Sequence, residues 1–194
     1  SSDVCSSDLV VTSRMNGGKG KMQGIELNYQ QFFDMLPEPF DGLGTQINYS
    51  YIDASGVPNT GTNGGDSFED TDELISATNS NEIGLEGQSE HTTNLILMYQ
   101  KSDFDARIAY NWRSEYLLTS YDNISRMPVY NEAAGFMDAS IFYDLTDNFK
   151  IGLQGVNLLN TQTQTYQLVD DEHKLGRSWF VNDRRYSLIV RANF

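Results

Sequence analysis

The sequence is poor in positive charge, with 13 Lys and Arg residues against 27 Asp and Glu residues and a net charge of −14. Proteins that bind nucleic acids need a basic surface to neutralise phosphates, so nucleic acid is excluded as a partner. The sequence also has one cysteine, Cys5, which cannot form a disulfide within the chain. Even so, 39% hydrophobic and 12% aromatic residues supply enough apolar material for an ordered structure.

Long hydrophobic runs are missing as well. The longest extends from Leu95 to Tyr99, which is the length of a strand and not of a membrane helix. This excludes membrane-spanning helices but not a transmembrane β-barrel, whose strands alternate lipid-facing and lumen-facing residues and have a low average hydropathy.

The first nine residues, SSDVCSSDL, nearly repeat Ser-Ser-Asp and lack the basic and apolar regions of a signal peptide. We expect residues 1–9 to be an adaptor-derived or disordered, non-native segment. Residues 10–194 then form the structural unit.

From residue 21 onward, segments with period-two alternation follow one another, each about the length of a tilted strand that crosses a bilayer. In the clearest, Phe104, Ile108 and Trp112 share one face, while Arg107 and Asn111 share the other. The predicted strands are residues 24–31, 43–52, 91–100, 104–114, 136–144, 150–160 and 184–194.

The links between these strands alternate in length. The first, third and fifth are short and rich in turn-forming residues, whereas the second, fourth and sixth are long and polar. Short periplasmic turns and long extracellular loops are typical of outer-membrane barrels. Seven strands are too few to close such a barrel, so the expected fold is an all-β, antiparallel transmembrane barrel fragment.

Several blocks resemble one family in the same order along the chain. They are GGKGKMQGIELNYQQFF, GLGTQINYSYIDASG, ARIAYNWRSEYLLT, FMDASIFYDLTDNFKIGLQGVNLLNTQ and VNDRRYSLIVRANF. Together they resemble the C-terminal barrel of TonB-dependent outer-membrane receptors, in the proteobacterial subfamily often linked to carbohydrate uptake.

The resemblance implies a 22-stranded barrel of the Gram-negative cell outer membrane, of which this chain supplies about seven C-terminal strands. It also implies an N-terminal plug that couples to TonB, and recognition of the terminal Phe194 by the barrel-assembly machinery. The expected function is TonB-coupled uptake of a scarce nutrient, a carbohydrate. An unplugged porin or adhesin barrel and a soluble β-sandwich binding module are the alternatives.

Candidate ligand-binding residues in the later long loops are aromatic or can form hydrogen bonds, as sugar binding requires. They are Tyr121, Arg126, Tyr130, His173 and Trp179. The competing interpretation is that aromatics form local cores in loops that fold on themselves. Four residues on the predicted lumen side are candidates for plug contact: Arg107, Asn111, Arg113 and Arg185.

The first long loop is acidic and includes Asp70, Asp72 and Glu73, a weak candidate for a cation site. A solvated loop, bridged to lipopolysaccharide by divalent ions, is the favoured interpretation. No catalytic motif is found, so we expect neither enzymatic activity nor a cofactor.

Overall fold

The computed structural model describes residues 20–54, 85–120, 122, 124–125, 127–169 and 173–193. The strands are β1 (Gln23–Phe32), β2 (Leu43–Asp53), β3 (His91–Lys101), β4 (Phe104–Arg113), β5 (Tyr116–Thr119), β6 (Val129–Asn131), β7 (Ala134–Thr146), β8 (Phe149–Val156), β9 (Gln162–Leu168), β10 (Lys174–Val181) and β11 (Arg185–Ala192). A short 3-10 helix, η1 (Phe40–Gly42), precedes β2. None of the helices in the described ranges has the length and apolarity to cross a membrane.

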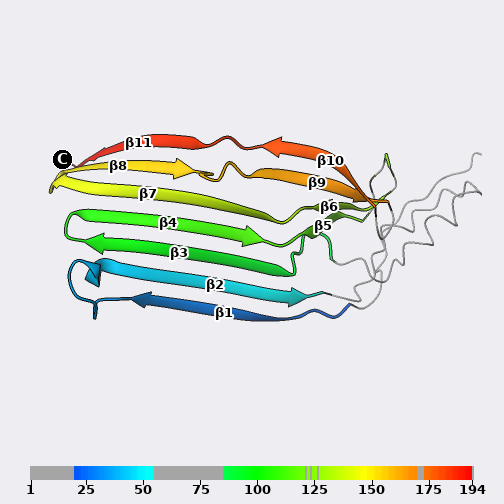
Figure 1. Cartoon of the computed structure of the whole chain (residues 1–194), viewed down its shortest axis with the longest axis horizontal. Helices are drawn as coiled ribbons and strands as arrows, with labels where there is room; N and C mark the ends of the chain where they lie inside the picture. The colour runs from blue at the N-terminus through cyan, green and yellow to red at the C-terminus, as the bar shows by residue number, and fades with distance from the viewer. Residues whose placement is uncertain are drawn as a thin grey trace, which may run out of the picture.

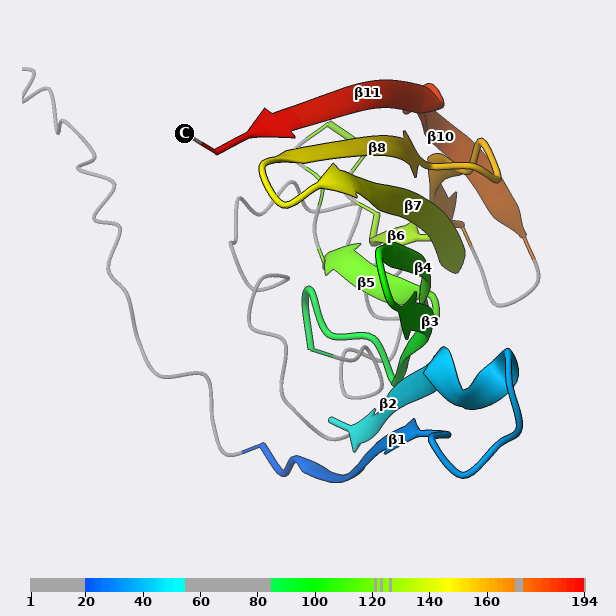
Figure 2. The same ribbon diagram turned by 90° about the vertical axis from the view of Figure 1, so that its left-hand side faces the viewer.

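Seven strands form one antiparallel sheet in the order β1-β2-β3-β4-β7-β8-β11. They coincide with the seven strands predicted from the alternating pattern, so the all-β, antiparallel fold class is confirmed. Figure 2 shows that the sheet curves into an arc. The arc does not close within the described residues, where β1 and β11 are the two edge strands.

The register places most apolar residues of the seven strands on one face, with Ile96, Phe136 and Phe142 among the exceptions on the other. Ile47 lies opposite Tyr29 and Leu95, and Leu153 lies opposite Ile141 and Leu188. These side chains are not covered by a second layer, since Leu153 is 61% exposed and Leu188 is 67% exposed. A continuous exposed apolar face of this extent fits contact with lipid and not with water. The opposite, polar face is therefore the lumen face.

The two ends of the sheet differ, as the link lengths predict. Figure 1 shows tight connections at one end, where the chain also finishes, and the long connections at the other. At the tight-turn end, which the link lengths predict to be periplasmic, the rings of Tyr99 and Phe104 meet edge to face with centroids 5.8 Å apart. Lys101 binds Asp41 there, with 2.7 Å between Nζ and Oδ1.

The long connections differ from the prediction, because two of them contain further strands. β5 and β6 follow β4, β9 and β10 follow β8, and together they form a four-stranded sheet in the order β10-β9-β6-β5. Figure 1 shows this extracellular sheet as an extension beyond the membrane-spanning strands. The pattern did not reveal these strands because they are short or, as in the polar β9 sequence QTQTYQL, lack apolar alternation.

Candidate functional site

The extracellular sheet has an aromatic core of its own. The rings of Tyr130 and Tyr166 stack with centroids 5.4 Å apart and an interplanar angle of 11°. Tyr166, Leu117 and Val129 are almost fully buried. Burial raises the pKa of Tyr166 to about 12 and also raises the pKa of Tyr130. Both phenols therefore stay neutral at physiological pH, and their rings stabilise the sheet.

Another aromatic side chain of this sheet faces outward. Trp179 on β10 is 58% exposed and lies opposite Gln164 of β9. Its ring packs over Gly176, where an added Cβ would come within 2.8 Å of the indole Cζ2 atom. A large ring with an exposed surface thus stands beside a carboxamide, which both donates and accepts hydrogen bonds.

Hydrogen bonds fasten the extracellular sheet to the residues that precede β3. Glu86 accepts hydrogen bonds from the Ser120 backbone N–H and hydroxyl, both at 2.6 Å. Arg113, at the extracellular end of β4, donates from Nε to the Ser89 hydroxyl at 2.8 Å and from a terminal nitrogen to the Gly87 carbonyl at 3.0 Å. The Arg113 guanidinium also lies 3.8 Å from the ring centroid of Tyr116.

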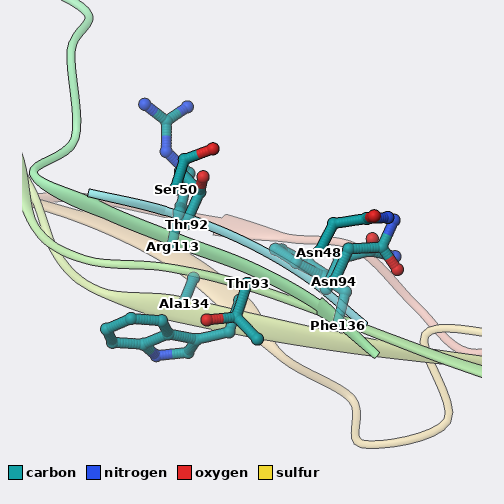
Figure 3. A pocket seen from close by; sticks show the side chains of 10 residues that line it. Asn48, Ser50, Thr92, Thr93, Asn94, Arg113, Ala134 and Phe136 are labelled. Atoms are coloured by element: carbon teal, nitrogen blue, oxygen red, sulfur yellow. The ribbon is translucent and has the colours of Figure 1, made fainter. Parts of the chain in front are cut away.

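The lumen face below this sheet carries polar groups over a hollow. A cavity of about 260 Å³ is lined by polar side chains, among them Asn48, Asn94 and Asn111, and by the apolar side chains of Trp112, Ala134 and Phe136, so that most of its surface is apolar. Figure 3 shows Asn48 and Asn94 side by side, with Ser50 and Thr92 on the same side of the sheet. The arrangement can hold a molecule that has both hydrogen-bonding groups and apolar surface.

The chain matches the family described as TonB dependent receptor-like, β-barrel, over residues 1–158. It belongs to that family. Membership implies a receptor barrel of the Gram-negative outer membrane that operates with TonB. A search of curated proteins found no match.

The predicted ligand-binding residues of this TonB-dependent receptor barrel occupy different environments. Trp179 is exposed on β10, and His173 is exposed immediately before the same strand. Tyr130 belongs to the stacked pair inside the extracellular sheet, which is the role that the local-core interpretation expected. Tyr121 and Arg126 lie outside the described residues, so their role stays a prediction.

The four predicted plug-contact residues all lie on the lumen face of the receptor barrel. Arg107 and Asn111 are exposed on β4, and Arg185 is exposed on β11. Arg113 is already engaged by Ser89, Gly87 and Tyr116. Contact of these side chains with a plug stays a prediction.

No cluster of three or more metal-binding side chains occurs among the residues that the structure describes. Asp70, Asp72 and Glu73 lie outside those residues, as does Phe194, the predicted assembly signal. The weak cation-site hypothesis and the role of Phe194 therefore stay predictions.

Two features of the receptor were missed by sequence reasoning. Gln164 lies opposite Trp179 only because β9 and β10 pair, and the polar segment QTQTYQL carries no apolar alternation that could have revealed β9. The alternating pattern puts Asn48 and Asn94 on the polar faces of their strands, but their adjacency depends on the register between β2 and β3.

Proposed function

We propose that this barrel is the C-terminal part of a receptor that captures a carbohydrate for TonB-coupled uptake. The observation that carries this proposal is the exposed indole of Trp179, directly opposite Gln164 in the extracellular sheet. The apolar face of a sugar ring stacks on an aromatic ring, and its hydroxyls match a planar group that donates and accepts hydrogen bonds. The location on the extracellular sheet suits first capture of a ligand from outside the cell.

The proposal includes further partners and no enzymatic activity. Additional strands of a longer polypeptide would pair with the edges of β1 and β11, and a plug would fill the lumen. Phe194 would be recognised by the barrel-assembly machinery, and the acidic segment that includes Asp70 would approach lipopolysaccharide through divalent ions. An unplugged porin or adhesin is the second candidate, distinguished by the absence of a plug from the complete protein.

The test uses the full-length receptor, purified in detergent and titrated with a panel of neutral oligosaccharides by calorimetry. Trp179→Ala is expected to weaken binding of the recognised sugar about tenfold, or ~1.4 kcal/mol. Tyr143→Ala is the control, because Tyr143 is an exposed aromatic residue on the lipid face of β7, opposite Phe104 and far from the extracellular sheet, and its loss should leave affinity unchanged. If the wild-type receptor binds no sugar of the panel, or if both variants bind as the wild type does, the proposal is wrong.

A further inference from the structure

Four asparagines form a row across four neighbouring strands of the lumen face. Asn28 lies opposite Asn48, Asn48 opposite Asn94, and Asn94 opposite Asn111. Asn28 and Asn48 lie near the middle of β1 and β2, whereas Asn94 and Asn111 lie toward the extracellular ends of β3 and β4, so the row crosses the wall of the barrel just below the extracellular sheet. Directly opposed residues in antiparallel strands are close enough for their side chains to interact.

Two carboxamide oxygens in the asparagine row have no hydrogen-bond donor. The Oδ1 atoms of Asn48 and Asn94 are buried and accept no hydrogen bond within the structure. A buried acceptor without a donor is costly, and native structures contain few of them. A half-turn of either carboxamide exchanges Oδ1 with Nδ2, which would turn the oxygen toward the adjoining hollow of about 260 Å³.

The surroundings of the central pair combine polar and apolar side chains. Ser50 and Thr92 face each other on the extracellular side of Asn48 and Asn94, and Gln46 faces Ile96 on the periplasmic side. Charges border the site, because Arg113 lines the hollow with its guanidinium bound to Ser89 and Gly87, and Glu26 of β1 lies opposite Ser50. Asn48 and Asn94 lie opposite uncharged residues, and Phe136 also lines the hollow, so a neutral ligand with hydroxyl donors and an apolar surface complements it.

We propose that the asparagine row is a binding site on the lumen wall for a neutral, hydroxyl-rich molecule, through which the ligand passes after capture at the extracellular sheet. This inference rests on the proposed carbohydrate function and adds a second site to it. After the half-turn, hydroxyl groups of the ligand donate to the Oδ1 atoms of Asn48 and Asn94. The neighbouring hydroxyls of Ser50 and Thr92 can donate to or accept from the same ligand.

The spacing of the row favours a polyol over an extended polypeptide. Adjacent strands lie about 4.8 Å apart, so the carboxamides repeat at about that distance. An extended chain presents N–H groups to one side every second residue, or about 6.7 Å apart, which does not match. Rotatable hydroxyls around a ring adapt to the shorter repeat.

The experiment compares uptake of the recognised sugar by cells with the full-length receptor and with the double variant Asn48→Leu, Asn94→Leu. Replacing unsatisfied amides by apolar groups of similar size is close to neutral for folding, so the barrel should assemble normally. Initial uptake below saturation is expected to fall about tenfold, while sugar affinity at the extracellular sheet is unchanged. Asn48→Ser, Asn94→Ser retains hydrogen-bonding hydroxyls and should restore most of the uptake.

A control on the same face is Gln154→Leu on β8, outside the asparagine row, which should transport at the wild-type rate. Unchanged uptake in the leucine double variant would overturn the inference while leaving the proposed function intact. Equal losses in the leucine and serine variants would show a structural role and overturn it too. If cells with the leucine variant admit a large antibiotic that cells with the wild-type receptor exclude, the asparagine row holds a plug segment in place. That result would also overturn the inference. A wild-type receptor that takes up no sugar would instead remove the proposed function itself.

Discussion

The guanidinium of Arg177 pairs with the carboxylate of Asp122, and this contact joins β10 to the connection between β5 and β6. The same carboxylate accepts hydrogen bonds from the backbone N–H groups of Ile124 at 3.1 Å and Ser125 at 2.9 Å. One aspartate therefore links two long connections that are 55 residues apart in sequence at this point. It also shapes the turn that follows it.

Substitutions of Asp122 should separate these two roles. Asp122→Asn keeps an acceptor for Ile124 and Ser125 but loses the charge that binds Arg177, whereas Asp122→Ala loses both. Amide hydrogen exchange of the full-length receptor should accelerate around Arg177 in both variants, and around residues 124–125 only in Asp122→Ala. Equal exchange at residues 124–125 in the two variants would contradict this assignment.

The Asp122 contact should also persist to low pH. Hydrogen bonds from Ser125 and then Arg177 lower the pKa of Asp122 from 3.8 to about 2. Because the pKa is lowered in the folded state, the stabilisation is complete above about pH 4 and disappears as the pH falls toward 2. The protection factor around Arg177, which is the intrinsic exchange rate at each pH divided by the measured rate, should stay high at pH 4 and fall on approach to pH 2.

Glu86 should control the attachment of residues 85–90 to β5. Burial raises the pKa of Glu86, but hydrogen bonds from Ser120 outweigh that effect and lower it overall from 4.5. The attachment is therefore present above pH 4.5 and weakens as the pH falls below it. Glu86→Gln should lower the free energy of local opening of residues 85–90, measured by hydrogen exchange at pH 7, by about 1 kcal/mol. Glu132→Gln, at an exposed glutamate, should leave this free energy unchanged. Equal protection in both variants would refute this role.

Gly152 should resist substitution because Phe142 of the neighbouring strand covers it. An added Cβ would lie 2.2 Å from the Phe142 Cδ1 atom, which no ordinary contact permits. Gly152→Ala should lower the free energy of unfolding by roughly 1–3 kcal/mol in a urea titration of the barrel in lipid vesicles. Adding Phe142→Ala should remove the clash, so the two substitutions together should cost less than the sum of their separate effects.

A charge introduced at two neighbouring residues of β11 should lower folding stability by very different amounts. Leu188→Arg places a guanidinium on the lipid face and should lower folding stability in vesicles by about 2–4 kcal/mol if the position is near the bilayer centre. Ser187→Arg introduces the same residue on the lumen face and should cost much less. Similar losses at the two positions would contradict the assignment of lipid and lumen faces.

The sequence by itself determined the seven membrane-spanning strands, their faces and the end at which the long connections lie. Leu188 and Ile108 could be assigned to the apolar face because successive residues of a strand point to opposite sides, which is a local property of the backbone. The alternating link lengths required no knowledge of pairing either. Trp179 could be chosen as an exposed candidate from its residue type, although nothing local placed it on a strand.

Tertiary structure decided which residues meet across strands. Tyr130 stacks on Tyr166 because two long connections pair with each other, so a candidate ligand residue became part of a core. Asn48 meets Asn94 through the register between β2 and β3. Register and the pairing of distant segments follow from the packing of whole strands and not from the pattern of any one of them. The lipid and lumen faces of the strands can therefore be assigned from the sequence, whereas the extracellular sheet and the asparagine row form only when distant strands pair.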